Sequence, residues 1–184
     1  PESILIQESS TPDTHISAIP SSIEALTKEA LEMANGIMKE YPNSVDSICL
    51  MANTCRSLGR SEEALTHWKR CLEIDATRSE IYDGIGRIAM QKGDSAEAVS
   101  MWRKALEVNP KIPKVGIRLA RALMSLEQAT ETVEVLKKEV KNSPESNWSH
   151  FLLGQAYYQL KDYKKAKRHY EEAARIEPEH TNAY

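Results

Sequence analysis

A strictly periodic pattern organises most of this 184-residue chain. Apolar and small residues recur at fixed places in four consecutive units of equal length, with no insertion or deletion between them, and a proline recurs near the end of three of the four units. The units span residues 45–78, 79–112, 113–146 and 147–180. A single unit of this size cannot bury its own apolar faces, so regular repetition predicts units that stack on their neighbours.

Each unit carries two apolar stripes with helical spacing. In the unit 79–112, the first stripe consists of Tyr82, Ile85, Gly86 and Ala89, and the second of Ala98, Trp102 and Ala105. Positions i, i+3, i+4 and i+7 lie on one face of a helix. The breaker Lys92-Gly93-Asp94 separates the stripes, and Pro110 ends the second. We therefore predict an all-α fold of stacked antiparallel helix pairs that together form a superhelix, an α-solenoid.

The pattern resembles the tetratricopeptide repeat family, whose 34-residue consensus is W-x2-L-G-x2-Y, then A-x3-F, then P. The resemblance covers residues 45–180, and it implies that the stacked helix pairs form a right-handed superhelix. It implies a non-enzymatic scaffold for protein–protein interaction that binds a peptide or a helix in a concave groove. The alternative is a substrate-docking array of a larger enzyme, such as a glycosyltransferase, with its catalytic domain outside these residues. A third hypothesis is a structural spacer in a large assembly.

The two ends depart from the regular units. Residues 1–20 are rich in Ser, Thr and Pro and are interpreted as a linker or a degenerate first helix. Residues 21–44 contain the helix of a partial repeat, with Ser21 as its N-cap, and residues 181–184 begin a truncated further repeat. The acidic N-terminal segment carries the apolar run Ile4-Leu5-Ile6. It is expected either to pack on residues 21–41 or to lie in a concave groove, including that of another copy, which would produce self-association.

The third unit, residues 113–146, matches the pattern least. Gly116 replaces a large residue, Thr132 replaces alanine and Glu139 replaces a small apolar residue, and its turn has no glycine. Two interpretations stay open. The differences are ordinary sequence drift, or they mark a softer joint in the array.

Charge and composition exclude several classes of protein. Lys and Arg total 24 against 27 for Asp and Glu, a net charge of −3, which argues against a general nucleic-acid binder. No apolar run approaches the roughly 18 residues of a membrane span. No targeting segment is visible, and the compartment stays open. An odd count of three cysteines fits either a reducing compartment or inert buried thiols, and the cytoplasm is the favoured compartment.

No spacing of nucleophile, base or metal ligand is recognisable, so we expect no enzyme activity and no catalytic, cofactor-binding or metal-binding residues. His67 and His169 occupy the same repeat position and are interpreted as surface residues. The basic residues of the last unit are interpreted as a solvated helix face.

The first helix of each unit offers a face opposite its core stripe, and in tetratricopeptide repeat proteins this face lines the concave groove. The residues predicted to bind a partner there are Asn53, Arg87, Lys114, Arg118, Arg121, Trp148, Phe151, Gln155 and Tyr158. Arginines beside aromatic residues are typical of interaction hot spots. We expect a protein or peptide partner that carries acidic groups and apolar anchors.

Two specialised forms of the family fit less well. The clamp that holds a chaperone's terminal carboxylate is matched by Asn53, Lys114 and Arg118, but Cys49 and Gly84 stand at its other two positions. The asparagine ladder of the O-linked N-acetylglucosamine transferase type is absent. The sequence therefore predicts a general peptide groove rather than either specialised form.

Overall fold

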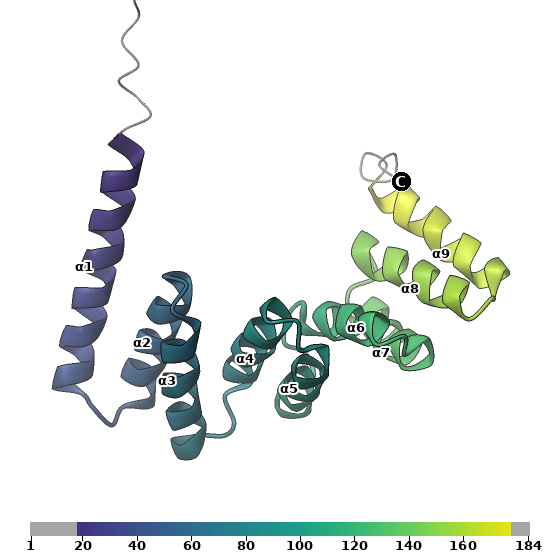
Figure 1. The fold of residues 1–184 in the computed structure, drawn as a ribbon. Coiled ribbons are helices and arrows are strands. Elements are labelled where there is room, and N and C mark those ends of the chain that lie inside the picture. The colour runs from purple at the N-terminus through teal and green to yellow at the C-terminus, as the bar shows by residue number, and fades with distance from the viewer. Residues whose placement is uncertain (1–17, 178–184) are drawn as a thin grey trace, which may run out of the picture. The chain divides into compact units, whose positions relative to one another are not determined.

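The computed structural model describes the backbone of residues 18–177 and the side chains of residues 25–177 (Figure 1). These residues form nine α-helices and no strand. The helices are α1 (Ala18–Glu40), α2 (Val45–Ser57), α3 (Ser61–Ile74), α4 (Ser79–Gln91), α5 (Ser95–Val108), α6 (Val115–Ser125), α7 (Ala129–Asn142), α8 (Asn147–Gln159) and α9 (Tyr163–Ile176). The all-α prediction is confirmed for this part of the chain. The chain divides into two compact units, residues 1–64 and 65–184, which are described separately.

The second compact unit is a stack of helix pairs. Helix α4 packs on α5, α6 on α7 and α8 on α9, and the pairs are joined by packing of α5 on α6 and of α7 on α8 (Figure 1). The two helices of each pair are separated by only three residues, so they run antiparallel. Pro110 and Pro144 lie two residues beyond the ends of α5 and α7. The predicted stacked antiparallel pairs are confirmed here.

The turn inside each pair has the same backbone geometry in every repeat. Gly59, Gly93, Glu127 and Lys161 all take left-handed φ angles, of 74°, 83°, 59° and 60°. The residue that follows each of them donates its backbone N–H to a carbonyl five residues earlier, for example Gln128 to Leu123 at 2.9 Å. This bond is the outer one of a Schellman motif and satisfies a carbonyl at the helix end. The missing glycine in the third unit therefore leaves the turn type unchanged.

Tryptophans fill the junctions between successive helices of the second compact unit. Trp102 is 2% exposed and shares a core with Val115 and Leu119 of the following repeat. A Cβ built on Gly86 would lie only 2.8 Å from Trp102 Nε1, so glycine is required at this close approach. Gly84 makes the same kind of room for Trp68, where a Cβ would come within 2.5 Å of the ring. The two glycines of Gly84-Ile85-Gly86 thus serve helix packing.

Two of the unusual residues in the third repeat compensate for each other. The Glu139 side chain lies directly over Gly116, in the space that a Cβ on residue 116 would take. Burial raises the pKa of the Glu139 carboxyl. The third unusual residue, Thr132, is fully buried and donates its hydroxyl to the Gln128 carbonyl at 2.9 Å. The three residues that depart from the repeat pattern therefore fit within the packing of the third repeat.

Helix α1 dominates the described part of the first compact unit. It packs on α2 through a face that includes the buried Ala34, while Leu26, Met33 and Tyr41 are 64%, 62% and 55% exposed. The helix begins at Ala18, three residues earlier than composition suggested, so Ser21 lies inside it and is not the N-cap. The proline at position 20 fits the first turn of α1, because its fixed φ is helical and its missing N–H is not needed there. The predicted contacts of residues 4–6 and the partial repeat at residues 181–184 lie outside the described residues.

Candidate functional site

A groove in the second compact unit brings together several of the predicted binding residues. It has a volume of about 940 Å³ and is formed by the loop before α6, the exposed face of α6, the end of α7 and the start of α8. We call it the α6–α8 groove. Its lining includes Lys114, Arg118, Arg121 and Trp148 from the predicted set. Lys111 and Lys141 also line it and were missed, because the sequence reasoning considered only the first helix of each repeat.

The basic side chains of this groove differ in how much of their charge is available. Lys114 and Arg121 are exposed, and within residues 25–177 neither of them forms an ion pair. Lys114 is the residue before α6 and has a left-handed φ of 65°. Lys114 and Arg121 therefore offer charge to a ligand from the beginning and the middle of the α6 segment.

Arg118 is different because it already has an acidic partner. Its Nη1 donates to Asp83 Oδ1 on α4 at 2.9 Å, and the two side chains are only 27% and 15% exposed. The same Asp83 oxygen accepts a hydrogen bond from Trp102 Nε1, also at 2.9 Å. Arg118 thus lines the groove with a charge that is largely offset inside the chain.

The predicted aromatic wall is split into two clusters at opposite ends of α8. Trp148, which is half-exposed, meets Phe151 edge to face with ring centroids 6.0 Å apart, and Phe151 also contacts Tyr170. Tyr158 is 61% exposed and packs on Tyr163 instead, with centroids 5.4 Å apart. Ten residues separate Trp148 from Tyr158, about 15 Å along a helix. Of these aromatic residues, only Trp148 lines the α6–α8 groove.

The remaining predicted residues lie elsewhere. Arg87 on α4 is exposed and Gln155 on α8 is half-buried, and neither is part of the groove lining. Asn53 lies on α2 in the first compact unit, where it lines an apolar hollow of about 370 Å³ beside Leu26 and Ala30 of α1.

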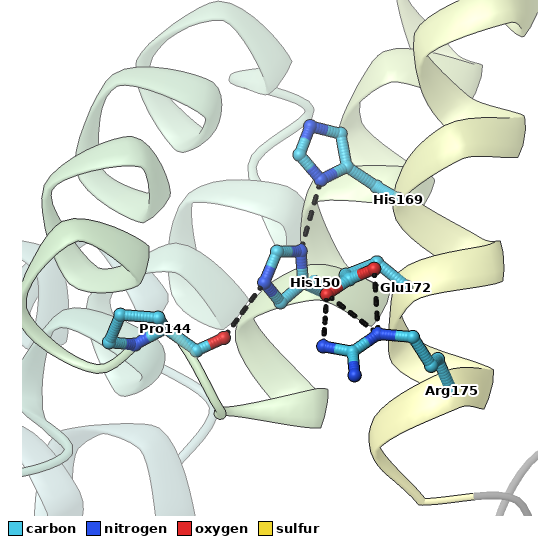
Figure 2. A network of polar contacts seen from close by, with 5 residues as sticks. All are labelled: Pro144, His150, His169, Glu172 and Arg175. Carbon is cyan, nitrogen blue, oxygen red and sulfur yellow. Dashed lines mark hydrogen bonds and ion pairs between the residues drawn. The ribbon is translucent and has the colours of Figure 1, made fainter.

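A histidine pair in the last repeat was not expected from the sequence. Figure 2 shows His150 of α8 between the Pro144 carbonyl and His169 of α9. The carbonyl can only accept, so His150 Nε2 carries a proton and donates to it at 3.1 Å. His150 Nδ1 lies 3.2 Å from His169 Nδ1, so the two rings share a hydrogen bond whose direction depends on the tautomer. His169 is therefore not a plain surface residue.

This pair has an electrostatic consequence. Burial, and next the neighbouring His150, lower the pKa of His169. The spacing of the sequence could not indicate the contact between His150 and His169, because the two residues lie 19 positions apart on different helices. The nearby Glu172 forms an ion pair with Arg175 at 2.7 Å (Figure 2).

The described residues contain neither a grouping typical of a metal site nor a helix suited to span a membrane. No group of three or more His, Cys, Asp or Glu side chains in this part of the chain has the arrangement of a metal site. No described helix combines the length and apolar character needed to cross a membrane.

Stacked helix pairs with a repeated turn, a repeated core and a charged groove define a helical-repeat protein of the protein-binding class. Models of the tetratricopeptide repeat match residues 45–78, 79–112 and 148–180, together more than half of the chain. The chain therefore belongs to the tetratricopeptide repeat family, and the predicted resemblance is confirmed. Proteins of this family bind proteins or peptides. No curated protein sequence matches the chain.

Several solved structures have a similar fold. A crystal structure of MamA matches with a TM-score of 0.76 and 17% identity, covering 89% of this chain and 95% of that chain. A MamA structure from Desulfovibrio magneticus RS-1, residues 41 to the end, matches with a TM-score of 0.74 and 19% identity, covering 88% and 91%. At these identities the likeness establishes the shared fold.

Proposed function

We propose that this chain is a non-enzymatic interaction scaffold whose α6–α8 groove binds an acidic peptide that carries an apolar anchor residue. The observation that carries the proposal is the lining of that groove. Two exposed cations that have no acidic partner among the described residues, Lys114 and Arg121, lie in the same hollow as the half-exposed Trp148. Lysine and arginine form strong charge-assisted hydrogen bonds with carboxylates, and exposed tryptophan is a common hot-spot residue.

The two kinds of side chain have different roles in this proposal. Lys114 and Arg121 would bind acidic groups of the peptide, and Lys111 and Lys141 would extend the positive potential along the walls. Trp148, supported by Phe151, would bind an apolar side chain at the α8 end. No observation in the described residues favours the alternative of a docking array for a larger enzyme.

The test uses a pair of fluorescein-labelled peptides measured by fluorescence anisotropy. One alternates glutamate with leucine, and the matched control replaces each glutamate by glutamine. The acidic peptide should bind, its affinity should fall with rising salt, and the glutamine peptide should bind at least about tenfold more weakly, because the bonds to Lys114 and Arg121 are charge-assisted. Equal binding of both peptides would contradict a basic groove as the site.

Variants then locate the site. The double substitution Lys114→Glu with Arg121→Glu should abolish binding of the acidic peptide. The matched control, Lys69→Glu with Lys104→Glu, makes the same charge change on exposed residues outside the groove lining and should retain most of the affinity. Arg118 is left unchanged, because a glutamate there would face Asp83 and disturb packing. Equal losses in both double variants would place the site elsewhere.

A further inference from the structure

We propose that Asp83 sets the affinity of the α6–α8 groove for acidic ligands by taking the place on Arg118 that a ligand carboxylate would otherwise occupy. This inference rests on the proposed function and adds a residue that limits the affinity of the groove for acidic ligands. Asp83 does not line the groove itself. It acts through Arg118, which does, and is therefore a positioning and charge-balancing residue.

The contact is built into the junction of three helices. Asp83 is on α4, Trp102 on α5 and Arg118 on α6. Asp83 Oδ1 accepts from Trp102 Nε1 and from Arg118 Nη1, each at 2.9 Å. Since Trp102 is 2% exposed, its indole N–H holds the carboxylate in a fixed position. The pairing of Arg118 with Asp83 is thus partly buried and anchored on the buried Trp102.

This arrangement weakens Arg118 as a ligand-binding group. A guanidinium has five N–H donors, and only Nη1 of Arg118 is bonded to Asp83, so the others can reach a ligand. A ligand carboxylate on those donors would be only a few ångströms from the Asp83 carboxylate. Like charges repel strongly at such distances where water is partly excluded. The groove should therefore respond weakly to a single acidic group and depend on groups that also reach Lys114 or Arg121.

The substitution Asp83→Asn separates charge from geometry. The asparagine carbonyl oxygen can accept from both Trp102 and Arg118, as the aspartate oxygen does, but the negative charge is gone. Affinity for the glutamate–leucine peptide should rise about five- to tenfold at low salt, as expected for removal of a nearby like charge in a partly exposed site. The glutamine–leucine peptide should bind with unchanged affinity.

Two further variants show whether the gain comes through Arg118. Glu80→Gln removes the same charge from an exposed residue one turn earlier on α4 and should change affinity less than twofold. In the double variant Asp83→Asn with Arg118→Gln, the gain should disappear, because no guanidinium is left to release. Asp83→Asn should still melt in a single cooperative transition, at a lower temperature than the wild type because its bonds lose the negative charge of the carboxylate, which confirms that the junction remains folded.

Each outcome decides the inference. The inference is supported if Asp83→Asn raises the affinity for the acidic peptide more than Glu80→Gln does, and if this rise depends on Arg118. Equal gains from Glu80→Gln, or a gain that persists without Arg118, show a general charge effect and overturn it. If the wild type binds the acidic peptide and Asp83→Asn binds it no better, this inference fails while the proposed function stands. If neither protein binds the peptide, both fail.

Discussion

Removing the indole of Trp102 should cost a large part of the stability of the second compact unit. The side chain is 2% exposed and packs with Val115 and Leu119 of the following repeat, so Trp102→Ala leaves a cavity between two repeats. Truncation of a large core aromatic costs about 3–5 kcal/mol. With a urea m-value of about 2 kcal/mol/M, typical of a small domain, the unfolding midpoint should fall by about 2 M.

Two further variants make this prediction specific. Trp102→Phe keeps most of the packing but loses the hydrogen bond to Asp83. A hydrogen bond to a charged group contributes about 1.5–3 kcal/mol, so the stability lost by Trp102→Phe should be smaller than that lost by Trp102→Ala. Trp148→Ala removes the same side chain from a 50% exposed position and should cost less than about 1 kcal/mol. Urea unfolding followed by far-ultraviolet circular dichroism measures all three variants. A loss below about 1 kcal/mol for Trp102→Ala, or equal losses at both tryptophans, would refute the assigned repeat register.

Three other perturbations test local features. Glu127→Gly should stabilise the protein by about 0.5–1 kcal/mol in urea melts, because the φ of 59° at Glu127 strains a residue with a Cβ. Lys161→Gly should have the same effect, and destabilisation by both substitutions would contradict the turn assignment. Glu139→Gln should raise the urea midpoint more at pH 7 than at pH 4. Burial raises the folded-state pKa of Glu139, so its contribution is favourable at low pH and is lost as the pH rises through that pKa; equal gains at both pH values would contradict this. The lowered pKa of His169 makes protonation favour unfolding. Stability should therefore fall as the pH drops below about 6.5, and His169→Gln should flatten that slope; an unchanged slope would exclude His169 as its source.

The regular spacing of the units predicted the helix pairs because it reflects backbone geometry that every repeat shares. Turns and core positions recur with the sequence: the left-handed residue falls at Gly59, Gly93, Glu127 and Lys161, which occupy the same position in successive repeats. Composition was a weaker guide at the N-terminus. Serine and proline suggested a boundary at residue 20, yet α1 begins at Ala18, since a first turn accommodates proline.

Contacts between particular side chains could not be predicted from the sequence. The placing of Glu139 over Gly116 involves two residues that do not recur in the other repeats, and the bond between His150 and His169 depends on His150, which does not recur either. A repeat pattern reports only what recurs, so a pair that forms in one repeat appears in it as two unrelated departures. For the same reason the sequence named Arg118 as a binding residue but could not show that Asp83 already neutralises it.

The chemistry of Asp83 depends on one repeat position that differs in every unit. The equivalent residues of the other three units are Cys49, Ile117 and Phe151, so the acid occurs in the second repeat alone. Ile117 lines the α6–α8 groove and Phe151 packs against Trp148 at its border, whereas Asp83 pairs with Arg118. The helix pairs thus repeat the same backbone structure, while the side chain at this position changes from one repeat to the next. On the proposed function, this change gives a bound peptide a direction, with its apolar anchor toward α8 and its acidic groups toward Lys114 and Arg121.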